Sequence, residues 1–90
     1  MTLRLKVITP RRLLADADAD VVALPTLEGE IGVLPGHRPL FTALGIGVLS
    51  YRVGGDEERF AVKGGFAEVR EDEVVVVTES DEDASAKAPD

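Results

Sequence analysis

Apolar and polar residues alternate along the first third of the chain with a period of two, which is typical of strands with one buried face. In Thr2–Ile8 the leucine and valine side chains share one side, and Arg4 and Lys6 share the other. In Leu13–Thr26 alanines alternate with aspartates. Because alanine and aspartate are poor strand residues, we expect a bend or bulge there and a firmer strand at Val21–Leu24.

Glycines and prolines are concentrated in Leu27–Leu44, and this pattern excludes a helix of useful length. The stretch predicts a tight turn at Glu28–Glu30, a strand at Ile31–Leu34, a corner at Pro35–Pro39 and a strand at Leu40–Leu44. A chain that turns so often builds an edge or an end of a β-structure.

The second half of the chain continues with short apolar runs separated by glycines and charged turns. It predicts strands at Val48–Val53, Arg59–Lys63, Phe66–Arg70 and Val74–Thr78, with turns at 45–47, 54–57, 64–65 and 71–73. Val74–Val77 is apolar on both sides, so it should be buried on both faces or covered by a partner. With no helical period anywhere, the pattern indicates an antiparallel sandwich or barrel.

Length and composition fit one small domain. Ninety residues bury a modest core, and 44% of them are hydrophobic. The absence of cysteine excludes a disulfide framework and a thiolate metal site. No apolar run is long enough to span a membrane. Arg4 and Lys6 interrupt the apolar residues near the N-terminus, so we expect no signal peptide.

The net charge of −7 argues against nucleic-acid binding, because neutralisation of phosphates drives that binding. The last twelve residues, 79–90, hold five acidic residues and one basic residue. They offer too little apolar surface to repay ordering. We therefore predict a folded domain at 1–79 and a disordered acidic tail at 80–90.

Three aspartates, Asp16, Asp18 and Asp20, have the spacing of the first three ligands of a calcium loop. The sixth position of such a loop should be glycine and is Val21, and the twelfth should be glutamate and is Leu27. In a strand the three carboxylates simply share the solvent face. The hypothesis of an acidic calcium-binding module therefore rests on these three aspartates alone.

No catalytic or cofactor site is indicated. His37 is the only histidine, the sequence has no G-x-S-x-G motif, and a lone histidine cannot build a usual zinc site. The glycines at 45–47 and 63–65 precede no helix, so they are turns and not phosphate loops. Glu28 and Glu30 lack the aromatic platform and deep cleft of a glycosidase. We therefore expect no catalytic residue, no cofactor and no metal, and a function that lies in the surface.

Two stretches resemble a known family. The run EGEIGVLPGHRPL at Glu28–Leu40 is close to E-G-[ED]-[LIMF]-G-[IV]-x-P-G-H-x-P-L, a signature of the epsilon subunit of F-type ATP synthases. FAVKGGFAEV at Phe60–Val69 resembles the later apolar–Gly-Gly–apolar–Glu-Val element of that family. The two matches have the order and spacing of the family, and the resemblance covers about Leu3 to Glu79.

The resemblance implies a flattened antiparallel β-sandwich of about ten short strands. It implies a non-catalytic rotor subunit of the central stalk that grips the gamma subunit with one face and rests on the c-ring at one end. Such a subunit helps to couple proton or sodium translocation to ATP synthesis or hydrolysis. It lies peripherally at the cytoplasmic face of the inner membrane, and we expect it to be a monomer when isolated.

The acidic residue of the family at the c-ring end matches Glu30. We expect contacts with the c-ring and with the gamma subunit from one rotor-facing region, which is formed by Glu28, Gly29, Glu30, Pro35, Gly36, His37 and Arg38.

Many family members continue into a two-helix hairpin, whereas Ser80–Asp90 offers no helix pair and no [IL]-D-x-x-R-A motif. We therefore predict coupling without helix-based inhibition and without ATP binding. The alternative is a free-standing sandwich that serves as an adaptor in another complex, with the tail as an acidic arm.

Overall fold

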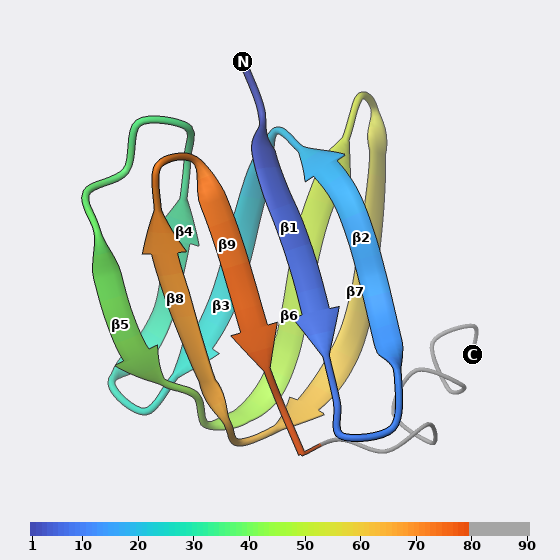
Figure 1. Ribbon diagram of the computed structural model, residues 1–90, viewed down its shortest axis with the longest axis vertical. Coiled ribbons are helices and arrows are strands. Elements are labelled where there is room, and N and C mark those ends of the chain that lie inside the picture. Colours follow the sequence, from blue (N-terminus) through green and yellow to red (C-terminus); the bar gives the residue numbers. More distant parts are fainter. Residues whose placement is uncertain (80–90) are drawn as a thin grey trace.

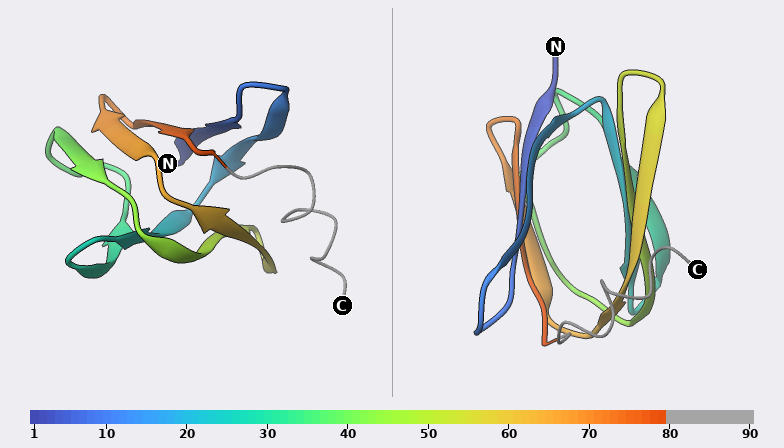
Figure 2. Two further views of the ribbon diagram at one scale, coloured as in Figure 1. Left: turned by 90° about the horizontal axis from the view of Figure 1, so that it is seen from below. Right: turned by 90° about the vertical axis from the view of Figure 1, so that its right-hand side faces the viewer.

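The computed structural model describes residues 1–79, which form nine strands and no helix. Two sheets pack face to face, as the edge-on view in Figure 2 shows. The strands are β1 (Leu3–Ile8), β2 (Leu13–Ala19), β3 (Val21–Thr26), β4 (Gly29–Val33), β5 (Leu40–Ala43), β6 (Ile46–Val53), β7 (Asp56–Lys63), β8 (Phe66–Arg70) and β9 (Glu73–Val77). The predicted all-β sandwich is confirmed. The predicted tail at 80–90 lies outside the described residues.

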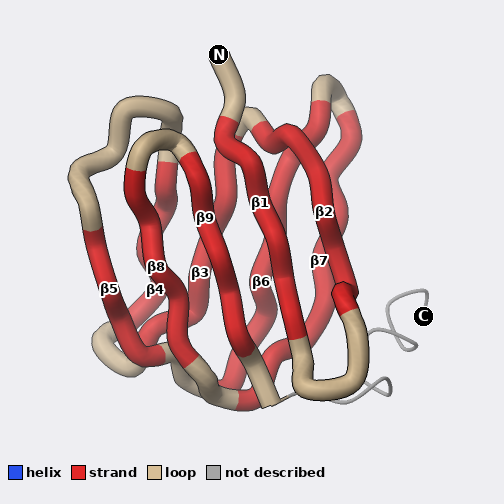
Figure 3. The backbone as a smooth tube through the Cα atoms, in the orientation of Figure 1, coloured by secondary structure: helices blue, strands red, loops and turns tan. Residues whose placement is uncertain are grey.

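One sheet has five strands in the order β2-β1-β9-β8-β5, and the other has four in the order β4-β3-β6-β7 (Figure 1). All neighbouring strands pair antiparallel except β1 and β9, which are parallel. The first and last strands of the described chain therefore lie side by side in the middle of one sheet. The connecting turns gather at the two ends of the sandwich (Figure 3).

The bend predicted within Leu13–Thr26 falls at Asp20, where the chain passes from the five-stranded sheet to the four-stranded sheet. The alternation shifts by one residue at the bend, because Ala15 and Ala19 are buried before it and Val22 and Leu24 after it. Val21, which the sequence pattern placed on the same side as the alanines, is therefore only half-buried.

A bulge sits earlier in the same stretch, where Leu14 of β2 is the extra residue between the pairs Val7–Ala15 and Ile8–Leu13. The alanines of β2 are the register partners of large apolar residues of β1, with Ala19 opposite Leu3, Ala17 opposite Leu5 and Ala15 opposite Val7.

The β6–β7 hairpin is longer than its sequence predicts. Pairing runs without a break from Ile46 opposite Lys63 to Val53 opposite Asp56, which leaves only Gly54 and Gly55 as the loop. Glycine suits the first loop position because Gly54 has a φ of 61°. The charged residues at 56–59 could join the strand because the hairpin extends beyond the core into solvent.

The core consists of aliphatic residues from both sheets, with Leu5, Leu24 and Leu49 among its fully buried side chains. Of the valine run in β9, Val74 and Val76 are buried in the core, whereas Val75 and Val77 are half-buried on the outer face. In the isolated chain the core covers the inner side of β9, and no other element covers the outer side within the described residues. Of the two predicted possibilities, coverage by a partner is the one that remains open.

Candidate interaction site

The structure separates the seven predicted contact residues into two groups at opposite ends of the sandwich. Strand β4 joins them, and its five residues span roughly 17 Å. We call the end that carries the turn at Leu27–Glu28 the turn end, and the end that carries the loop 34–39 the corner end (bottom and top of Figure 1). The expectation that all seven flank one region is therefore wrong.

At the turn end, hydrogen bonds fix the loop between β3 and β4. The Thr26 hydroxyl donates to the Gly29 carbonyl at 2.5 Å and accepts from the Glu28 N–H at 3.1 Å. Gly29 has a φ of +117°, which a side chain rarely tolerates. The turn lies at 27–28 and not at the predicted Glu28–Glu30, so Glu28 is in the turn and Glu30 is in β4. Both carboxylates are exposed on an ordered backbone.

Two exposed aliphatic side chains lie at the same end. Leu27 is 72% exposed and Ile46 is 86% exposed. The Leu27 side chain reaches over Gly45, next to Ile46 in the chain, because its Cδ2 lies 3.6 Å from where a Cβ on Gly45 would stand. Our sequence analysis did not single out this pair. The one signal for it in the sequence was Leu27, a large apolar residue at a turn position.

At the corner end, Leu34–His37 form a β-turn that is closed by the His37 N–H donating to the Leu34 carbonyl at 3.0 Å. Pro35 supplies the fixed φ of the second turn position, and Gly36 has a φ of +88° at the third. His37 Nδ1 lies 2.7 Å from the Arg38 carbonyl oxygen. The single histidine therefore shapes the corner backbone.

A hydrogen bond from the neighbouring sheet ties this corner down. Asp72, in the β8–β9 turn, accepts the Gly36 N–H through Oδ1 at 2.7 Å. Asp72 itself has a φ of 62°, a conformation that aspartate tolerates better than most residues. This bond links the loop between β4 and β5 to the turn between β8 and β9, which are far apart in the sequence.

Removing this acceptor should loosen the corner alone. We expect Asp72→Gly, which also relieves the positive φ, to speed amide hydrogen exchange at Gly36 roughly tenfold, because a hydrogen bond to a charged group contributes about 1.5 kcal/mol. Asp72→Asn keeps an acceptor oxygen but loses the charge, so its exchange rate at Gly36 should lie between those of the wild type and Asp72→Gly. Equal protection at Gly36 in wild type and Asp72→Gly would show that this bond does not hold the corner.

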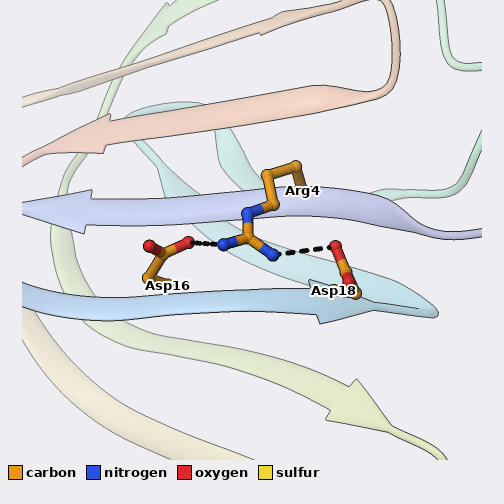
Figure 4. Close-up of polar contacts among 3 residues, drawn as sticks. All are labelled: Arg4, Asp16 and Asp18. Carbon is orange, nitrogen blue, oxygen red and sulfur yellow. Dashed lines mark hydrogen bonds and ion pairs between the residues drawn. The ribbon is translucent and has the colours of Figure 1, made fainter.

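The three aspartates of the calcium hypothesis are paired within the chain, and two of them share one partner. Arg4 contacts Asp16 at 2.6 Å and Asp18 at 3.1 Å across the β1–β2 pair (Figure 4). The hydrogen bond that Arg4 donates to Asp18 and the negative charge of Asp16 raise the pKa of Arg4 above its ordinary value. Asp20 instead accepts the Gly54 N–H at 3.1 Å. Within residues 1–79 no three His, Cys, Asp or Glu side chains lie close enough together to hold a metal ion.

The described residues thus define a class of protein, a small all-β sandwich with ordered turns at both ends and exposed apolar side chains. No helix in residues 1–79 could cross a membrane. Residues 2–84 match the family described as ATP synthase, Delta/Epsilon chain, beta-sandwich domain, and the chain belongs to this family.

Curated relatives carry the name ATP synthase epsilon chain. The protein from Carboxydothermus hydrogenoformans is 48% identical over 80 residues, which cover 89% of this chain and 60% of the relative. The protein from Alkalihalophilus pseudofirmus is 45% identical over 85 residues, which cover 94% of this chain and 64% of the relative. The chain therefore spans somewhat less than two thirds of the length of these relatives.

Solved structures share the fold. A chain in the Euglena gracilis mitochondrial ATP synthase, in an assembly of OSCP, F1 and c-ring, has a TM-score of 0.83 and 27% identity, and the match covers 97% of this chain and 61% of that one. A chain in the central stalk and c-ring of the Tetrahymena thermophila enzyme has a TM-score of 0.72 and 19% identity, with coverage of 89% and 65%. The second likeness shows the fold alone.

Proposed function

We propose that this chain is a non-catalytic subunit of the central stalk of an F-type ATP synthase. In this role it binds the gamma subunit and the c-ring and helps to couple ion translocation to ATP synthesis or hydrolysis at the cytoplasmic face of the inner membrane. The observation that carries the proposal is the family match over residues 2–84. The related chain in an F1 and c-ring assembly supports it.

The turn end is the part of the molecule that we assign to the c-ring. Glu28 and Glu30 are exposed on an ordered loop and can pair with basic groups of a partner. Such an exposed pair contributes only ~0–1 kcal/mol, so it orients the contact more than it holds it. Leu27 and Ile46 lie at the same end, and their exposed side chains supply apolar area that a stable contact with the c-ring requires.

We assign the residues of the corner end to a different partner. Pro35, Gly36, His37 and Arg38 lie at the far end of β4, so they do not share the c-ring contact of the turn end. The corner leads directly into β5 at the edge of the five-stranded sheet. We therefore assign these four residues to the neighbourhood of the gamma subunit.

Reversing one charge tests the end-on contact. We expect Glu30→Lys to weaken binding of the purified chain to isolated c-ring about fivefold to tenfold, because an attractive pair of about 1 kcal/mol becomes repulsive. Its melting temperature and its affinity for gamma should stay unchanged. Asp56→Lys, an equal charge reversal at the opposite end, is the matched control. Undiminished c-ring binding by Glu30→Lys would remove the turn end from this contact.

A further inference from the structure

Two hydrogen bonds fix the point at which the chain leaves the sandwich after β9. The N–H of Thr78 donates to the Ile8 carbonyl at 3.0 Å, and the Thr78 hydroxyl donates to the Gly64 carbonyl at 2.9 Å. Ile8 ends β1, and Gly64 directly follows β7. Thr78 is 1% exposed, so the chain passes to Glu79 from a held position. We call this position the chain exit (lower end of Figure 1).

The loop between β1 and β2 holds two arginines on one side of the chain exit. Arg11 and Arg12 are both exposed. The hydroxyl of Thr9 accepts hydrogen bonds from the N–H groups of Arg11 at 3.2 Å and Arg12 at 3.1 Å, and donates one to the Arg12 carbonyl at 3.1 Å. Thr9 is 5% exposed and directly follows Ile8, the acceptor at the exit. The backbone that carries the two guanidinium groups is therefore ordered.

Lys63 stands on the other side of the chain exit, at the end of β7. It directly precedes Gly64, which accepts the hydroxyl of Thr78, and its side chain is exposed. It is also the register partner of Ile46, so it belongs to the turn end. One side of the exit therefore comes from the five-stranded sheet and the other from the four-stranded sheet. We call Arg11, Arg12 and Lys63 the basic collar.

The acidic segment that follows the exit fits the collar in charge and in reach. Residues 79–83 include four acidic residues, Glu79, Asp81, Glu82 and Asp83. Five extended residues reach at most about 17 Å, whereas packed sheets lie about 10 Å apart. The segment can therefore meet cations of both sheets. Its covalent attachment at the exit gives it a high effective concentration there, an advantage that a second, equally acidic copy lacks.

Other parts of the described sandwich suit the segment less well. The opposite end carries Asp56 at the start of β7 and the acidic run 71–73, which would repel it. Glu28 and Glu30 share the turn end with the collar, but β4 and β7 are opposite edges of the four-stranded sheet. Those two carboxylates therefore leave the collar side of this end cationic.

We propose that residues 79–83 dock on the basic collar and cover it, as a self-neutralising contact within the chain. The bonds of Thr78 aim the segment, and the collar attracts its carboxylates. Because a single exposed ion pair contributes little, the contact depends on several pairs acting together and is screened by salt. The docked segment withholds the three cations from other anionic groups at the turn end. This contact does not depend on which complex the chain joins.

A spin label tests the docking in the otherwise unaltered chain. The sequence has no cysteine, so Ser85→Cys accepts one nitroxide two residues beyond the segment. The label should enhance the relaxation of the Arg11 and Gly64 amides. This enhancement should fall at least threefold from 10 mM to 1 M salt, because the screening length shortens from about 30 Å to about 3 Å. Enhancement that is independent of salt would overturn the proposal.

Charge-removing variants of the labelled chain show which cations hold the segment. Arg11→Gln/Arg12→Gln/Lys63→Gln should reduce the enhancement at Gly64 at least threefold at low salt. The matched control Arg52→Gln/Arg59→Gln/Arg70→Gln removes three cations from other sites and should leave the enhancement nearly unchanged. Equal losses in the two variants would show that net charge, and not the collar, attracts the segment.

A competing anion tests whether the segment covers the collar. The variant Glu79→Gln/Asp81→Asn/Glu82→Gln/Asp83→Asn keeps the length of the segment and removes its charge. It should bind inorganic tripolyphosphate at least threefold more tightly than the wild type, as read from the amide shifts of Arg11 and Arg12. Equal affinities would show that the collar is not covered and would overturn this part of the proposal.

Discussion

Gly65→Ala is expected to lower the free energy of unfolding by roughly 3 kcal/mol or more, enough to unfold a large fraction of a small domain. A Cβ at this position would stand 2.0 Å from the Val77 carbonyl oxygen and 2.7 Å from the Thr78 Cα. Both atoms belong to the backbone and cannot rotate away. The φ of +108° adds conformational strain. Urea denaturation followed by circular dichroism measures the loss.

Two other glycines make this prediction specific. Gly64 also has a positive φ, +78°, but a Cβ there meets nothing within 4 Å, so Gly64→Ala should cost about 1 kcal/mol. Gly55 has neither the positive φ nor a close neighbour, so Gly55→Ala should be nearly neutral. If Gly65→Ala cost no more than Gly64→Ala, the close approach of β9 to this turn would be refuted.

Leu49→Ala should destabilise the sandwich by about 2–5 kcal/mol, the range for deleting a buried leucine side chain. Leu49 is fully buried and lies on β6, an inner strand of the four-stranded sheet, where the core has no route to collapse around the cavity. The midpoint of urea denaturation should fall accordingly.

Val48 provides the control because it is the preceding residue of the same strand and points to solvent. Val48→Ala should change stability by no more than about 0.5 kcal/mol, as exposed substitutions usually do. Similar losses in the two variants would mean that the alternation along β6 does not assign its faces as described.

Local patterning predicted much of this fold because strand faces follow directly from alternation. Thr2–Ile8 and Phe66–Arg70 were placed within a residue of β1 and β8. Local patterning could not predict which sheet a strand joins or which distant strand it pairs with, because these depend on contacts between distant segments. Nothing near Asp20 marks a passage between sheets, and no local signal makes β1 and β9 parallel neighbours.

The candidate site was predicted only in part for the same reason. The sequence placed Glu28, His37 and Arg38 correctly at loop positions, whereas Glu30 lies in β4 and not in the predicted turn. It also grouped the Glu30 turn with the His37 corner. A predicted strand at Ile31–Leu34 already lay between them, and an extended strand necessarily separates its two ends. Leu27 and Ile46 escaped notice because their proximity depends on a contact between two turns that are distant in the sequence.

Reconstitution of the wild-type chain with purified gamma subunit and c-ring tests the central claim most directly. The account predicts that the chain co-elutes with gamma in equal amounts and that this pair then binds the c-ring. A chain that retains its β-sheet circular dichroism but elutes alone in the presence of both partners would contradict the account. It would favour an adaptor module of another complex.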